Sequence, residues 1–156
     1  MHPEPLTLVR VSDECTELIK ECKIIRIECF RFDCELSDKL QPGHGTDCHC
    51  GILTISTNLG TCGLGQFVIP CGNLKGDFVQ WASVFQKLKG LPLQDGLQYV
   101  HQKQEAWGEV RSHLMATALT NLSEKLENLS TASEQELSYL SNRTYLFEHS
   151  GAYISF

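Results

Sequence analysis

A stretch rich in histidine and cysteine in the first third of the chain has the residue types that bind zinc. Its imidazole nitrogens and thiolate sulfurs come from His44, Cys48, His49 and Cys50. The spacing argues against a shared ion, because only one residue separates Cys48 from Cys50, whereas a zinc knuckle has roughly two to four. Adjacent residues such as His49 and Cys50 also rarely bind one ion together. We therefore expect a surface loop here and keep these four residues as a minor zinc hypothesis.

Three glycines, Gly60, Gly63 and Gly65, are the second chemical candidate, since glycine-rich loops bind phosphate. A phosphate loop leads from a strand directly into the first turn of a helix. These glycines instead flank or interrupt a predicted strand, which favours turn and bulge roles.

The histidines of the second half are the third candidate. His101, His113 and His149 each have acidic or hydroxyl residues nearby in the sequence. No serine or cysteine is presented at a recognisable nucleophile turn, so we expect surface or packed histidines.

Composition and charge narrow the function classes. The chain has 156 residues, a formal net charge of -6 and a pI near 5.5, which argues against a nucleic-acid partner. No apolar run approaches the roughly 18 residues that a membrane helix needs, and the first 20 residues lack the pattern of a secretory signal. We expect a cytoplasmic protein, no membrane partner, and eight reduced cysteines that serve mainly as small hydrophobic residues.

The elements that would hold these residues begin with a small antiparallel sheet. The β-branched and aromatic residues of 23–36 predict a strand whose apolar side changes near Cys29, as a bulge would produce. Residues 37–50 have the composition of a loop. Asn58, Leu59 and Gly60 predict a tight turn between strands at 51–57 and 61–69.

In the second half of the chain the apolar residues recur every three to four positions, which predicts helices. A predicted stripe comprises Phe78, Trp81, Ala82, Phe85 and Leu88, followed by helices at 95–107 and 109–129 and a shorter one at 134–140. The stripe of the longest helix is predicted to contain Val110, His113, Leu114, Thr117, Ala118, Leu122, Lys125 and Leu126. The fold class is therefore α+β, with a three-stranded antiparallel sheet followed by a helical bundle.

In this order of elements the sequence resembles the amino-terminal capping domain of the mandelate racemase and muconate lactonizing enzyme branch of the enolase superfamily. Residues 23–28 look like the usual first strand, residues 60–66 are similar to a "G-x-x-G-x-G-E" turn, and residues 118–125 lie where "A-L-W-D-L-K-G-K" is common. The segment 139–156 resembles an "L-L-G-G" motif followed by the first barrel strand. The sequence departs from these motifs at Gln66, Thr120, Asn121, Ser141 and Asn142.

The resemblance implies a domain organisation. It suggests an amino-terminal extension at 1–22, a capping domain at 23–151 and a remnant of the first barrel strand at 152–156. In such enzymes the metal-binding carboxylates and the catalytic bases lie on later barrel strands. We therefore expect no catalytic residue, no metal site and no cofactor on this chain, and magnesium only together with a barrel.

The resemblance also implies where specificity would reside. Capping domains contact the substrate through the loop after the first strand and through a hairpin turn, which here correspond to 37–50 and 58–61. The candidate substrate-specificity residues are Gly43, His44, His49 and Leu59.

Three hypotheses about function follow from these features. The first is a non-catalytic capping-domain homologue that binds a partner protein or another copy of itself through an apolar helical face. The second is an N-terminal fragment or subunit of a metal-dependent racemase, cycloisomerase or sugar-acid dehydratase. The third is a metal or redox module built on the stretch from Cys48 to Cys50.

Overall fold

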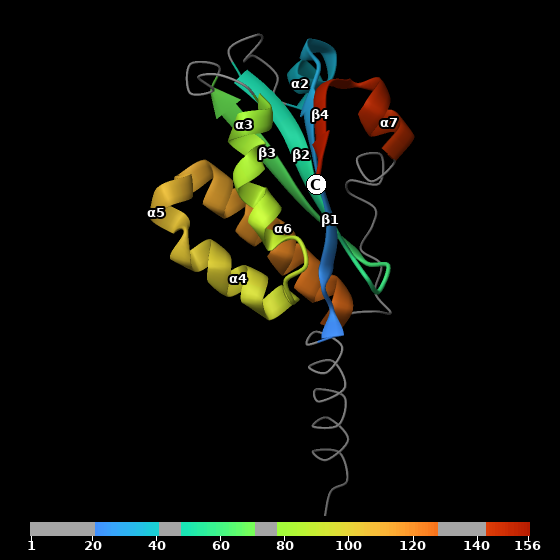
Figure 1. Ribbon diagram of the computed structural model, residues 1–156. Coiled ribbons are helices and arrows are strands. Elements are labelled where there is room, and N and C mark those ends of the chain that lie inside the picture. The colour runs from blue at the N-terminus through green and yellow to red at the C-terminus, as the bar shows by residue number, and fades with distance from the viewer. Residues whose placement is uncertain (1–20, 41–47, 71–77, 128–142) are drawn as a thin grey trace, which may run out of the picture.

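A four-stranded antiparallel sheet lies at the centre of the computed structural model, which describes residues 21–40, 48–70, 78–127 and 143–156. Its order is β3-β2-β1-β4 (Figure 1). The strands are β1 (Ile24–Phe32), β2 (Cys48–Thr57), β3 (Cys62–Pro70) and β4 (Ser150–Ser155). The predicted hairpin of β2 and β3 is confirmed, with Gly60 in its turn at a φ of 83° that glycine adopts readily.

The prediction of three strands is one strand short. Residues 152–156 were expected to be the remnant of a barrel strand, but β4 pairs antiparallel with β1 in the same sheet, with Cys29 opposite Ile154. The pairing joins segments more than 100 residues apart, so a local sequence pattern cannot predict it. Its side chains alternate between half-buried and exposed, which is typical of a strand at the edge of a sheet.

The apolar side of β1 changes as predicted, but at a different residue. The register with β2 shifts between Ile24 and Arg26, and Ile25 is 50% exposed, so the irregularity lies four residues before Cys29. Beyond it, Ile27 and Cys29 contribute to one core of the protein and Phe30 to another. Ordinary alternation along β1 therefore supplies the two apolar surfaces, and the bulge places Ile24 in the same core as Ile27.

The region after β1 also differs from the prediction. The strand ends at Phe32, and helix α2 (Cys34–Leu40) takes the place of the end of the predicted strand and the start of the predicted loop. The Asp33 carboxylate accepts a hydrogen bond of 2.9 Å from the Leu36 backbone N–H, which satisfies a free donor of the first turn. This cap is the local reason for the helix.

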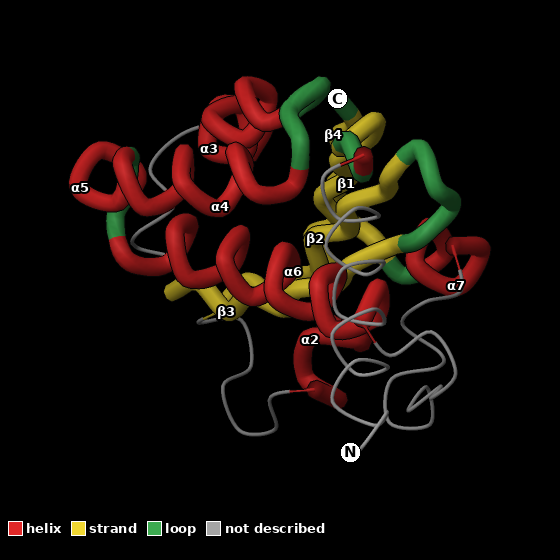
Figure 2. The backbone as a smooth tube through the Cα atoms, turned by 90° about the horizontal axis from the view of Figure 1, so that it is seen from below, coloured by secondary structure: helices red, strands yellow, loops and turns green. Residues whose placement is uncertain are grey.

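Helices cover both faces of the sheet (Figure 2). One face packs against α3 (Phe78–Ala82), the 3₁₀ turn η3 (Ser83–Leu88), α4 (Leu93–Gln102), α5 (Gln104–Trp107) and α6 (Glu109–Glu127). The other face carries α2 and α7 (Arg143–Glu148) over a smaller core. Within the described residues, no helix is both long and apolar enough to cross a bilayer.

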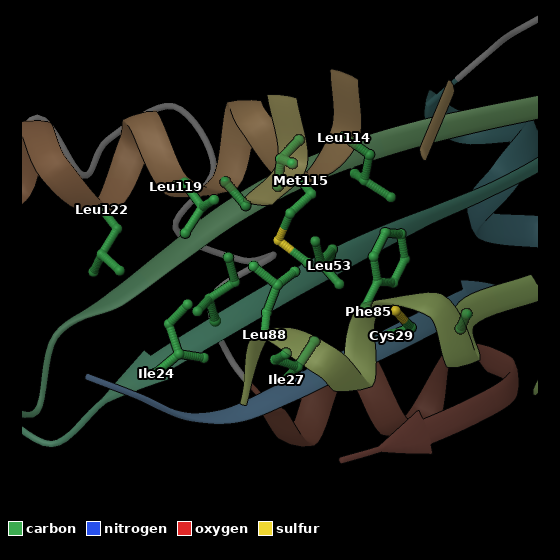
Figure 3. Packing of buried hydrophobic residues seen from close by; sticks show 14 of the residues in the cluster. Ile24, Ile27, Cys29, Leu53, Phe85, Leu88, Leu114, Met115, Leu119 and Leu122 are labelled. Carbon is green, nitrogen blue, oxygen red and sulfur yellow. The ribbon is translucent and has the colours of Figure 1, made fainter. Parts of the chain in front are cut away.

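The larger core contains most of the predicted helical stripe, and Figure 3 shows Phe85 and Leu88 of that stripe within it. Phe78, Ala82, Phe85 and Leu88 are buried there, as core packing requires. Cys22, assigned to the amino-terminal extension, is buried in the same core. The remainder of that extension and the helix expected at 134–140 lie outside the described residues.

The buried side of α6 is only partly the predicted one. Leu114, Ala118, Leu122 and Leu126 are buried as expected, together with Ser112, Met115 and Leu119. By contrast, Val110, His113, Thr117 and Lys125 are exposed. The buried side faces β3. Gly63 and Gly65 have no side chains, so the helix backbone lies close to the strand: a β-carbon on Gly63 would lie 2.4 Å from the Ala118 carbonyl oxygen. These two glycines therefore serve helix packing.

Candidate functional site

The candidate specificity residues lie at opposite ends of the sheet. His49 is at the start of β2, opposite Ile69, whereas Leu59 is 41% exposed in the turn after the end of that strand. Ten residues of strand separate these ends, a length of roughly 30 Å. Gly43 and His44 lie outside the described residues. The structure therefore does not bring Leu59 and His49 together around one ligand.

The geometry of β2 argues against a zinc ion shared by His49 and Cys50. Cys50 is buried in the smaller core beneath α2, so its neighbour His49 projects from the opposite face of the sheet. Burial, and then the positive charge of Arg31, lower the pKa of His49, and burial raises the pKa of the Cys50 thiol. Across the described ranges, no group of three or more His, Cys, Asp or Glu side chains could hold a metal ion.

A buried carboxylate on β1 is the centre of a polar cluster that was not predicted from the sequence. Glu28 is only 2% exposed and lies on the same face of the sheet as Phe30. Its Oε2 accepts hydrogen bonds of 2.6 Å from the Arg143 guanidinium and 2.5 Å from the Tyr153 hydroxyl. Its Oε1 lies 3.5 Å from both the Thr54 hydroxyl and Arg26 Nε. Four side chains thus compensate one buried charge.

The surroundings of Glu28 raise the pKa values of two neighbouring groups, Arg143 and Tyr153. The hydrogen bond to Glu28 is the main cause that raises the pKa of Arg143, so this guanidinium stays charged. Burial, followed by the hydrogen bond to Glu28, raises the pKa of Tyr153. The Tyr153 hydroxyl therefore remains a donor near neutral pH, and the cluster works as an anchor for α7 and β4 on β1.

Sequence reasoning did not single out this cluster. Glu28 lies within the strand predicted at 23–36, where a charged residue two positions before Phe30 was the available signal. Its partners follow 115 and 125 residues later, so their identity could not be read from spacing.

Beside this anchor, Arg143, Phe147 and Tyr153 form an exposed group that we call the C-terminal patch. The Phe147 and Tyr153 rings have centroids 4.6 Å apart and are 44% and 36% exposed. The Arg143 guanidinium carbon lies 5.3 Å from the centre of the Phe147 ring. Phe30 lies against both aromatic rings, which supports the patch from the core.

Comparison with known proteins identifies the fold. No protein-family model and no curated protein sequence matches the chain. Among solved structures, it is similar to L-talarate dehydratase from Polaromonas sp. JS666, with 17% identity over 67% of this chain and 29% of that one, at a TM-score of 0.50. A mandelate racemase/muconate lactonizing enzyme from Roseovarius nubinhibens ISM matches with 18% identity over 65% and 29%, at a TM-score of 0.44.

The match to L-talarate dehydratase confirms the resemblance at the level of the fold. The described architecture is that of the N-terminal portion of mandelate racemase/muconate lactonizing enzyme-like proteins. The chain spans about 30% of the length of the solved structures that it matches.

Proposed function

We propose that this chain is a capping-domain homologue that acts by binding protein and has no racemase or dehydratase activity of its own. The fold supports the proposal, because in L-talarate dehydratase it corresponds to 29% of the chain and belongs to a larger protein. A domain of this kind needs at least one surface that packs against other polypeptide.

The C-terminal patch is the observation that carries the proposal. Phenylalanine, tyrosine and arginine are enriched at the centres of protein interfaces, and these three side chains lie in contact on one exposed site. The helical stripe that the sequence suggested for docking fills the larger core instead. The patch therefore replaces the stripe as the binding surface in this proposal.

The same proposal places the chain in the cytoplasm. The described residues include five free cysteines, two of them only partly buried. Thiols in this state suit a reducing compartment.

A second candidate function is favoured by the comparison itself. L-talarate dehydratase from Polaromonas was solved with Mg and L-glucarate, so this chain could supply the N-terminal part of a magnesium-dependent sugar-acid dehydratase. Magnesium would then be bound by residues outside the described part of this chain, in which no group of three or more potential ligands lies together. Metal-dependent turnover by the purified chain separates the two candidates.

Sedimentation velocity at several concentrations, paired with affinity capture, tests the proposed function. We expect the wild-type chain to self-associate or to retain a partner, because the patch leaves two aromatic rings in water. Phe147→Glu should abolish self-association and weaken partner retention, since it places a charge in the patch. Leu59→Glu is the matched control at another exposed apolar position and should behave like wild type.

Circular dichroism verifies that both variants are folded. A wild-type chain that stays monomeric and retains no protein would contradict the proposal. So would association of Phe147→Glu at wild-type strength.

A further inference from the structure

The outer edge of β3 is closed by side chains along its first half. Strand β3 is at the end of the sheet, so alternate residues direct their backbone N–H and C=O groups away from β2. The Leu64 N–H donates to the Asn121 side-chain oxygen at 3.0 Å, and the Cys62 carbonyl accepts from Lys125 Nζ at 2.8 Å. Both capping side chains come from α6.

The second half of this edge, which we call the open half, has no such partner among the described residues. The same alternation directs the backbone groups of Gln66 and Val68 outward, because they follow Leu64 at steps of two residues. Within the described ranges, no side chain or backbone group bonds to them on that side. An edge with free donors and acceptors at this spacing is complementary to another extended strand.

A groove of about 330 Å³ runs beside this open half. Residues 66–68 form its strand side, and the first turns of α6 form the other side through Glu109, Val110, His113 and Leu114. Leu114 is buried on the side of α6 that faces the sheet (Figure 3), whereas Val110 is 40% exposed at the rim. The groove therefore presents apolar surface directly beside the free backbone groups.

The apolar and acidic residues that line the groove indicate which side chains a bound segment would need. An extended segment pairing with Gln66 and Val68 would direct every second side chain toward α6. A β-branched residue suits the apolar part formed by Val110 and Leu114. Glu109 contributes a carboxylate at the rim, and the chain as a whole is acidic, which favours a basic residue in the segment.

We propose that the open half of the β3 edge binds an extended, basic and β-branched segment of a partner protein by strand addition, in the groove between β3 and the start of α6. This inference rests on the proposed protein-binding function and names a second site for it, with the partner chemistry of that site. The site is separate from the C-terminal patch, which lies over α7 and β4.

A peptide titration followed by amide NMR tests the proposal on the full chain. The probe is a synthetic peptide of about seven residues that alternates valine with threonine and lysine. We expect saturable shifts of the Gln66, Val68, Val110 and His113 amides. The same peptide with alternate backbone amides N-methylated should bind at least about tenfold more weakly, because it lacks the donors for β3.

Two matched variants examine the strand itself. Val68→Pro removes the outward N–H without touching the ladder with β2 and should weaken binding about tenfold, whereas Val68→Thr keeps that N–H and should stay within about twofold of wild type. Replacing lysine by glutamate in the peptide should also weaken binding, and Glu109→Lys should reverse that preference.

Equal binding of the N-methylated and unmodified peptides would overturn the proposal even if Val68→Pro fails to fold. Absence of saturable shifts at these amides would overturn it too. Should Phe147→Glu still abolish association in that case, the proposed function stands and only the β3 site fails.

Discussion

At the scale of single residues, Glu28 is the side chain on which the C-terminal segment depends. It is buried on the central strand β1, while Arg143 and Tyr153 reach it from α7 and β4. A buried carboxylate is costly unless it is paired, and here charge-assisted hydrogen bonds provide that compensation. The same bonds fix two members of the C-terminal patch, so the anchor and the proposed binding surface share residues.

Substituting Glu28 by glutamine should destabilise the protein. The variant keeps the shape of the side chain but loses the charge in the bonds to Arg143 and Tyr153, so we expect the free energy of unfolding to fall by about 1–3 kcal/mol. Urea denaturation measures the change. Glu35→Gln, at an exposed position of α2, is the control and should remain within about 0.5 kcal/mol of wild type. A stability of Glu28→Gln equal to that of the control would refute the anchor.

Tyr153 should make the free energy of unfolding fall at alkaline pH. Its pKa in the folded chain is raised above the ordinary value of 10.0, so its contribution is fully present below about pH 10 and is lost as the pH rises through the folded value. We expect Tyr153→Phe to lose less stability than wild type over the range in which the pH rises above about 10. Denaturation midpoints across this range compare the two proteins, and parallel curves would contradict the expectation.

At the scale of elements, the contact between β3 and α6 organises the larger core. Gly63 and Gly65 let the helix backbone approach the strand, and Asn121 and Lys125 of the same helix then cap half of the strand edge. The half beyond these caps is where the groove lies. One packing contact therefore determines both the closed and the open part of the edge.

A methyl group on Gly63 should disturb this contact. Its β-carbon would lie 2.4 Å from the Ala118 carbonyl oxygen and 2.8 Å from Leu122 Cβ, so strand and helix must separate. We expect Gly63→Ala to lower the free energy of unfolding by about 1–3 kcal/mol. Gly151→Ala is the control on another edge strand, because its nearest neighbours are 4.0 Å away. Similar stabilities of the two variants in thermal denaturation would show that the close approach is unimportant.

The elements differ in how far local sequence determines them. The hairpin was predictable because Asn58, Leu59 and Gly60 encode a turn between two β-rich segments. Helix α2 was missed because it has only seven residues and its main signal is the cap at Asp33. Strand β4 was missed as part of the sheet because its partner β1 lies more than 100 residues earlier, and local patterns carry no information on such pairing.

The candidate site was less predictable than the fold. His49 and Leu59 were singled out from the resemblance, and the structure sets them at opposite ends of β2. Glu28 depends on partners brought together only by the folded sheet. Its burial could be inferred from the apolar residues around it, but Arg143 and Tyr153 could not be identified from the sequence.

At the scale of the whole molecule, the chain is a sheet with helices on both faces, and the match to L-talarate dehydratase covers 67% of it. The three features discussed above have separate places in this arrangement. The anchor and the C-terminal patch lie on the side of α7, whereas the open strand edge lies beside α6. The proposed protein binding therefore has two candidate surfaces, and each has its own test.

The central claim is that this fold acts here by binding protein and not by dehydratase or racemase chemistry. Incubating the purified chain with magnesium and L-glucarate, the pair present in the Polaromonas enzyme structure, tests that claim most directly. Conversion of L-glucarate, followed by proton NMR, should equal that of a sample without protein. Magnesium-dependent conversion above that background would contradict the claim.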